Sequence, residues 1–220
     1  MAENEGFNKL EHYFLIETEL HYSFSEGKRG CFAMLEFANN SFYALSGFDY
    51  NYNGLLFERS HYQDNNKIRS KIKELDDKLI YSPLEDDAVI CKETAVTELN
   101  LSNCQDCEEN CLMTLKDVYN SITKDDKVFI AKVKDLFNCC EKMLLWRVYK
   151  NYKESNTKTV SGKLYIKWRP CEERGCVQLI KNKNFQNLQV MYVYEDYDDF
   201  IKKLKNESQL PSLKTFDRDQ

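Results

Sequence analysis

The chain has 220 residues, 42% of them hydrophobic, and carries 14 Tyr and 13 Phe, so it is long and apolar enough to bury the core of one domain. Its net charge of −5 argues against a protein whose whole surface binds nucleic acid, so any basic binding surface has to be local. No apolar run is long enough for a signal peptide or a transmembrane segment, so we expect an intracellular protein, cytoplasmic or nuclear.

The first clear pattern along the chain is a β-hairpin. Residues 31–37 and 41–47 are rich in residues that favour strands, and Ala38-Asn39-Asn40 between them suits a tight turn. We therefore expect two antiparallel strands here.

Helical periodicity dominates the middle of the chain. Apolar residues three or four positions apart predict a helix over residues 68–79 and another from about residue 88. One long amphipathic helix is expected next, capped by Thr123 or Asp125 and with apolar residues on one side from Phe129 to Val148. The remaining elements are a strand at Leu164 to Trp168, a short helix from Cys176, a strand at Leu188 to Tyr194 and a last helix around Phe200.

The order of these elements predicts the fold class. Strands that alternate with helices toward the C-terminus favour an α/β protein, with three α/β/α layers and a mixed sheet of roughly five strands. We expect residues 1–210 to form a single domain with a helical, Cys-rich insertion at about residues 102–125. Residues 211–220 are expected to be a flexible tail.

Nine cysteines favour metal binding over a disulfide framework, because their number is odd and no secretion signal precedes them. The sharpest pattern is Pro170-Cys171, where a predicted strand ends, followed after a short turn by Cys176 at the start of a helix. Two thiols at such a junction lie close together, and a helix N-terminus favours the thiolate that binds a cation. Two buried cysteines without a metal are the alternative.

An upstream partner for this pair is Cys91-Lys92-Glu93. A cysteine and a glutamate two residues later, near a helix start, can face one cavity, with the carboxylate beside a metal ion and not bound to it. The spacing alone is common by chance, so its weight comes from the order of the motifs.

In that order of motifs the chain resembles the zinc deaminases of the cytidine deaminase-like superfamily, especially divergent members related to bacterial polymorphic toxins. The likeness covers about residues 31–204. The chain departs from the family pattern in having four residues between Cys171 and Cys176 where two are usual, although Gly175 can let the loop close. It also has Cys91 where the family more often has a histidine.

The resemblance implies a zinc-dependent hydrolase that deaminates cytosine or adenine in a nucleotide or a single-stranded nucleic acid. Cys91, Cys171 and Cys176 would hold Zn²⁺ with one position open for water, and Glu93 would be the general acid and base. Three thiolates carry more negative charge than zinc neutralises, so the water would be less acidic than with histidine ligands. The alternatives are a catalytically inactive binding protein with this fold and, more weakly, a metal-independent nuclease.

A second candidate metal site is Cys104-x-x-Cys107-x-x-x-Cys111, which has part of the spacing of a zinc knuckle. Cys139 and Cys140 could complete it, although adjacent cysteines on a helix are more typical of core packing.

Three aromatic residues are candidates for stacking on a base: Tyr50 and Tyr52 in a polar loop after the hairpin, and Trp168 before Pro170. A nucleotide or single-stranded nucleic acid is therefore the expected partner, with no membrane partner.

Overall fold

The structure is a computed structural model that describes residues 31–45, 49–50, 57–58, 79–81, 88–101, 111–121, 127–155, 161–196, 198–200, 202 and 213–219. Its elements in chain order are β1 (Phe32–Phe37), β2 (Asn40–Leu45), β3 (Asp49–Tyr50), β4 (Phe57–Glu58), β5 (Leu79–Tyr81), β6 (Val89–Cys91), α3 (Lys92–Leu99), β7 (Leu112–Thr114), α4 (Leu115–Ser121), α5 (Lys127–Phe137), α6 (Cys140–Ser155), β8 (Gly162–Trp168), α7 (Cys176–Lys181), η1 (Lys183–Phe185), β9 (Leu188–Tyr194) and β10 (Lys214–Thr215).

The main sheet has six strands in the order β10-β9-β8-β1-β2-β5. Strand β1 is antiparallel to β2 and β8, and β9 is antiparallel to β10, whereas the pairs β8–β9 and β2–β5 are parallel. The described residues also form two-stranded sheets from β3 and β4 and from β6 and β7. The α/β class and the mixed sheet are thus confirmed, with six strands where about five were expected.

The predicted hairpin is present as β1 and β2, and its turn explains the register. Phe37 pairs with Asn40, so Ala38 and Asn39 alone form the loop. Both have positive φ, 50° and 60°, as a two-residue turn that matches the twist of antiparallel strands requires.

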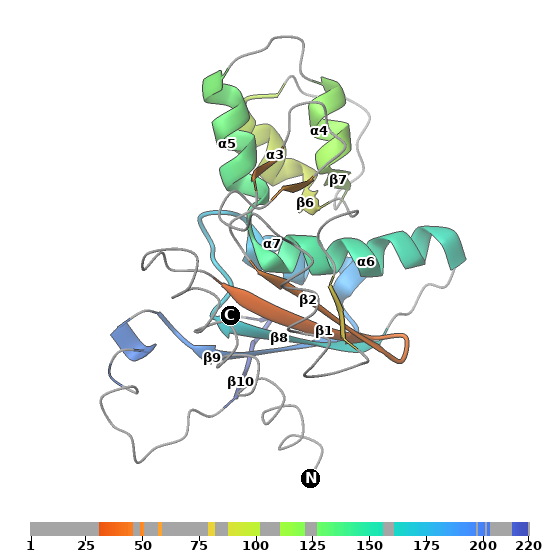
Figure 1. The fold of residues 1–220 in the computed structure, drawn as a ribbon, viewed down its shortest axis with the longest axis vertical. Coiled ribbons are helices and arrows are strands. Elements are labelled where there is room, and N and C mark those ends of the chain that lie inside the picture. Colours follow the sequence, from red (N-terminus) through yellow and green to blue (C-terminus); the bar gives the residue numbers. More distant parts are fainter. Residues whose placement is uncertain are drawn as a thin grey trace.

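Helix α6 joins the sheet to the rest of the molecule. It packs across β1 and β2, and Leu144 and Val148 on it are completely buried in the same apolar core as Leu35 and Ile166 of the sheet. Helix α7 lies beside α6, and a smaller lobe of α3, α4, α5, β6 and β7 lies on the side of α6 away from the sheet (Figure 1). Within the described ranges, no helix is long and apolar enough to cross a membrane.

Two predicted helices differ from the observed elements. The helix expected from about residue 88 begins as strand β6, and α3 starts only at Lys92. The long helix expected up to residue 148 is divided into α5 and α6, because the Cys139 carbonyl accepts hydrogen bonds from the N–H groups of Lys142 and Met143 and so starts a new helix. Most of the helices expected at residues 68–79 and around residue 200 lies outside the described residues.

The C-terminal residues expected to be a flexible tail include a strand of the main sheet. Lys214 in β10 pairs with Tyr192 in β9, and Phe216 is buried. Arg218 donates hydrogen bonds to the main-chain carbonyls of Ile180, Phe185 and Leu188. The guanidinium group therefore links the C-terminal segment to the ends of α7 and η1 and to the start of β9. Such hydrogen bonds leave no periodic pattern in the sequence, so they could not be predicted from it.

Candidate metal centre

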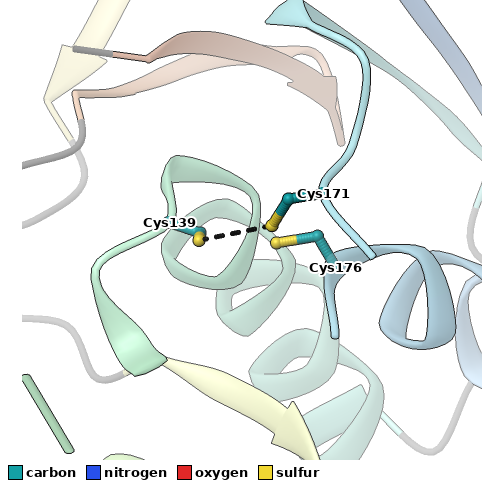
Figure 2. A group of neighbouring side chains, drawn as sticks. All are labelled: Cys139, Cys171 and Cys176. Atoms are coloured by element: carbon teal, nitrogen blue, oxygen red, sulfur yellow. Dashed lines mark hydrogen bonds between the residues drawn. The ribbon is translucent and has the colours of Figure 1, made fainter. Parts of the chain in front are cut away.

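Three cysteines from distant parts of the chain converge beside α6. The sulfur atoms of Cys139, Cys171 and Cys176 all lie within 4.8 Å of one another, and the Sγ atoms of Cys139 and Cys171 are 3.9 Å apart. Figure 2 shows the three side chains pointing toward one another. Cys139 and Cys176 are buried, and Cys171 is partly exposed. This group has the geometry to hold a metal ion.

Local backbone structure brings the three thiols together. Cys139 sits at the break between α5 and α6, and Cys171 follows Pro170 at the end of β8. The Cys171 carbonyl accepts hydrogen bonds from the N–H groups of Cys176, at 3.0 Å, and Val177, at 3.2 Å. Gly175 has a φ of 74°, which closes the loop and lets the four-residue gap between the two cysteines place both sulfurs at one point.

The three thiols share protons unequally. Hydrogen bonds from Cys139 and Cys176 hold the pKa of Cys171 far below that of an ordinary thiol. The hydrogen bond to Cys171 raises the pKa of Cys139, and those to Cys139 and Cys171 raise the pKa of Cys176. The group therefore favours the thiolate at Cys171 and the protonated form at the other two sulfurs, and a cation between them would favour ionisation of all three.

Two basic residues adjoin the thiols. Lys142 is completely buried, and its ammonium donates hydrogen bonds to the carbonyls of Leu136 and Arg174, one on each segment that carries ligands. Its positive charge favours the ionised forms of Cys139 and Cys171. The side chain of Arg174 contacts Cys139 and forms an ion pair with Asp135 at 2.9 Å. These cations offset negative charge gathered on the sulfurs.

A buried carboxyl group is close enough to the three thiols to interact with them electrostatically. Glu141 is only 4% exposed, and burial, followed by the negative charge of Cys171, raises its pKa to about 7. The Cys140 thiol donates a hydrogen bond to Glu141 Oε2 at 3.2 Å. Glu141 therefore lies beside the cysteine group, in a position to hold or release a proton near neutral pH.

Cys31, Cys140 and Glu141 form a second group whose ligand atoms all lie within 4.8 Å of one another. The Cys140 and Cys31 sulfurs are 3.1 Å apart. Among the described residues, these two groups are the sets of three or more cysteine, histidine or acidic residues close enough to hold a metal ion.

The sequence-based ligand set is only partly brought together. Cys171 and Cys176 lie side by side, but among the described residues Cys91 belongs to neither group. Cys91 ends β6, and its sulfur accepts a hydrogen bond from Asn182 at 3.9 Å. Glu93, expected to act as the general acid and base, is exposed in the first turn of α3. The structure thus pairs Cys171 and Cys176 with Cys139 in place of Cys91.

The other candidate residues lie apart from the centre or outside the described part. Cys104, Cys107 and Tyr52 lie outside it, and Tyr50 ends the short strand β3. Cys111 is partly buried and belongs to neither of the two cysteine groups found in the described residues.

Trp168 is the one aromatic candidate near the cysteines in sequence, and its ring lies 5.6 Å from that of Tyr194 and 5.5 Å from that of Phe200. It is partly exposed at the end of β8, two residues before Pro170.

The signal that identifies the third thiol was present in the sequence. Cys139-Cys140-Glu141 has the same Cys-x-Glu spacing as Cys91-Lys92-Glu93, and it lies at the head of the helix that precedes β8. This Cys-x-Glu segment was overlooked because residues 129–148 were interpreted as one continuous helix, and a ligand was expected at the start of a helix and not in its middle.

Comparison of the chain with models of protein families, with curated proteins and with solved structures found no match.

Proposed function

We propose that this protein is a zinc-dependent hydrolytic deaminase that acts on a cytosine or adenine in a nucleotide or single-stranded nucleic acid. Cys139, Cys171 and Cys176 are the zinc ligands of this proposal, and Glu141 is its general acid and base. The observation that carries it is the convergence of three thiols, together with a buried carboxyl group on the residue two positions after the first of them.

The donor atoms fit zinc in type and spacing. Zn–S bonds of about 2.3 Å in a tetrahedron put two sulfurs about 3.8 Å apart, and the Cys139 and Cys171 sulfurs are 3.9 Å apart. Three protein ligands leave the fourth position of a tetrahedral ion open, as in catalytic zinc sites. Zinc bound there would supply a water molecule acidic enough to act as a nucleophile near neutral pH.

The role of Glu141 as general acid and base is supported by its position: it is near the three cysteine ligands but is not one of them. Its carboxyl group is close enough to Cys171 to respond to the charge on that thiol, yet it is not part of the set of three sulfurs. A residue so placed can take a proton at one carboxylate oxygen and return it to the leaving amine. Glu93, in contrast, is exposed on α3.

The charge of the site also supports a metal centre with three thiolates. Zinc neutralises two of three negative charges, and a buried residual charge is unfavourable unless a cation lies near it. Lys142 is completely buried, and Arg174 contacts Cys139. Both residues compensate the excess negative charge that three thiolate ligands, with no histidine among them, would leave on the zinc site.

A base-containing substrate is supported by aromatic residues at the ends of β8 and β9 and shortly after β9. Trp168, Tyr194 and Phe200 form a cluster in which Phe200 meets both other rings edge to face, at 5.5 Å and 5.1 Å. The Lys167 ammonium lies 4.9 Å from the centre of the Trp168 ring. Tyr194 is buried, but Trp168 and Phe200 are partly exposed, and an exposed ring with a cation beside it suits a base and its phosphate. Tyr50 and Tyr52 stay candidates for contacts with the substrate.

The proposal includes a deaminase-like arrangement in three layers. It is supported by the mixed sheet and by α6 and α7, which come directly before and after β8; Cys139 directly precedes α6, and Cys176 is the first residue of α7. The lobe between β5 and α6 is then the insertion, and it extends well beyond residues 102–125.

Zinc analysis and ammonia release test this function together. We expect one zinc ion per chain and release of ammonia from a cytosine- or adenine-containing substrate. Glu141→Gln should lower that rate by about 10²–10⁴-fold while zinc content and unfolding stay close to those of the parent. Glu93→Gln is the matched control and should retain activity, because its side chain is exposed. Full activity of Glu141→Gln contradicts the proposal.

The second candidate is a non-catalytic domain in which the same cysteines hold a structural metal ion. It is favoured by burial, because Cys176 is completely buried and Glu141 is only 4% exposed. In that case zinc is present, removal of zinc lowers thermal stability, and neither the parent nor Glu141→Gln releases ammonia from cytidine, adenosine or single-stranded DNA and RNA.

A further inference from the structure

A second pair of thiols lies next to the proposed zinc ligands. The sulfurs of Cys31 and Cys140 are 3.1 Å apart, although the two residues are 109 positions apart in the sequence. Cys31 directly precedes β1, and Cys140 is the first residue of α6. Since α6 packs against β1 in the core, the fold itself holds the two sulfurs together. The proposed zinc chemistry uses neither of them.

We propose that Cys31 and Cys140 form a modification site at which a hydroperoxide produces an intramolecular disulfide. A disulfide bond is about 2.05 Å long, so the sulfurs need to approach by only about 1 Å from their observed separation.

The difference in exposure of the two residues sets the order of the steps. Cys31 is partly exposed, whereas Cys140 is completely buried, so the oxidant reaches Cys31 first. The Cys31 sulfur attacks the outer oxygen of the hydroperoxide and breaks the O–O bond, which yields a sulfenic acid on Cys31 and an alcohol, or water from hydrogen peroxide. The Cys140 sulfur then attacks the Cys31 sulfur, and the hydroxyl group leaves with the Cys140 proton as water. Two thiols are oxidised and one peroxide is reduced.

The disulfide changes the surroundings of Glu141. The Cys140 thiol donates to Glu141 Oε2 at 3.2 Å, and the disulfide removes that donor. If Glu141 carries the proton in deamination, oxidation lowers the activity and reduction restores it. This consequence rests on the proposed function, whereas formation of the disulfide does not.

Peptide mapping of the zinc-loaded protein after treatment with hydrogen peroxide tests the proposal. Zinc protects Cys139, Cys171 and Cys176, so we expect the loss of two thiols per chain, a single Cys31–Cys140 cross-link, unchanged zinc content and reversal by dithiothreitol. The cross-link should be absent from Cys31→Ser. It should form unchanged in Cys111→Ser, which removes another partly buried cysteine that belongs to neither group in the described residues.

Three outcomes overturn the proposal: cross-links that join only other cysteines, oxidation of Cys31 to the sulfinic acid without a cross-link, or the loss of two thiols per chain in Cys31→Ser as in the parent. Should Cys31→Ser fail to fold, Cys31→Ala removes the same sulfur with a smaller, apolar group. If the protein binds no zinc, the proposed function is contradicted and the disulfide proposal is not. Peptide mapping of the zinc-free protein still shows whether Cys31 and Cys140 become cross-linked.

Discussion

The sulfur of Cys139 lies 3.9 Å from that of Cys171, although the two residues are 32 positions apart and belong to different elements. Cys139 reaches this position because α5 ends before it and α6 begins directly after it. A cysteine within one continuous helix of residues 127–155 would lack the turn that directs its side chain toward the end of β8. The break between the two helices is therefore what assembles the cysteine group.

The ligand assignment predicts which cysteines the metal requires. Cys139→Ser and Cys171→Ser should each reduce bound zinc from one ion per chain to a small fraction, because loss of one of three thiolate ligands removes a large part of the binding free energy. Cys91→Ser should keep its zinc. Elemental analysis after dialysis measures the content, and Co²⁺ in place of zinc reports thiolate ligands by its charge-transfer absorption. Loss of zinc from Cys91→Ser and not from Cys139→Ser would restore the ligand set inferred from the sequence.

Zinc affinity should fall as the pH is lowered. The raised pKa values of Cys139 and Cys176, due first to their hydrogen bonds within the group, keep both residues protonated near neutral pH. Zinc has to displace those two protons, and a lower pH favours the protonated thiols, so the logarithm of the binding constant should rise with a slope of about 2 per pH unit between pH 6 and pH 8. Cys171 adds nothing to this slope, because its lowered pKa leaves it ionised throughout.

Competition with a chelator at several pH values measures this slope. Calorimetry in buffers of different ionisation enthalpy counts the protons released. A pH-independent affinity would show that the thiols are not the ligands.

Lys142 should be needed for both folding and metal binding. Lys142→Met keeps the length of the side chain but leaves the buried carbonyl of Leu136 and the partly buried carbonyl of Arg174 without this donor. The loss at Leu136 should cost about 1–3 kcal/mol in the free energy of unfolding, and the loss at Arg174 should cost less. The substitution also removes a positive charge beside the thiolates, so zinc affinity should fall. Urea unfolding and chelator competition measure the two effects. Lys132→Met, at an exposed position on α5, should change neither.

Much of the fold could be predicted from the sequence because its signals are local. The hairpin predicted around Ala38 to Asn40 is observed with Ala38 and Asn39 as its turn, and the apolar strand at residues 188–194 is observed as predicted. The break between α5 and α6 at Cys139 could not be predicted. The apolar positions of the two helices continue with nearly the same period, and only the hydrogen bonds of the folded chain show that they are separate helices.

The candidate site was predictable in part for the same reason. Cys171 and Cys176 are close in sequence, so a turn and Gly175 suffice to join them. The third ligand of the proposal, Cys139, is brought to the other two by long-range packing. Two Cys-x-Glu segments, which begin at Cys91 and Cys139, could supply this ligand, and the sequence does not show which of them does. Only the folded chain shows that Cys139, before α6, lies beside Cys171 and Cys176 and that Glu93 is exposed.

Gly175 should tolerate no side chain, because the loop between Cys171 and Cys176 requires its φ of 74°. A Cβ atom at this position would lie 2.5 Å from Thr94 Cγ2 and 2.9 Å from Thr94 Oγ1. Gly175→Ala should therefore lower the free energy of unfolding by about 1–2 kcal/mol for the left-handed backbone alone, and by more for the clash. It should also reduce zinc content, since the loop carries two ligands.

Thr94→Ala separates these two contributions. In the double variant Gly175→Ala/Thr94→Ala, the smaller side chain at residue 94 relieves the clash with the new Cβ atom but not the backbone strain at residue 175. The free energy of unfolding should therefore recover only in part. Thr94→Ala alone is the control. Full recovery in the double variant would show that the backbone conformation contributes little.

Arg218 should stabilise the fold through the segment that the sequence suggested was a flexible tail. Its guanidinium donates to the carbonyls of Phe185, at 2.9 Å, and Leu188, at 2.7 Å, and also to that of Ile180. Hydrogen bonds from a charged donor contribute about 1.5–3 kcal/mol, so Arg218→Met should lower the free energy of unfolding by an amount in this range. Urea unfolding measures it.

Arg169→Met provides a matched control for that loss. Arg169 is exposed and pairs with Glu195 at 3.6 Å, an interaction of about 0–1 kcal/mol at a protein surface. Deletion of residues 213–220 should destabilise the protein at least as much as Arg218→Met, because it also removes β10 and the buried Phe216. If the deleted protein unfolds at the same urea concentration as the parent, β10 and Arg218 do not hold β9 and α7 in place, and the C-terminal residues do not contribute to the stability of the sheet.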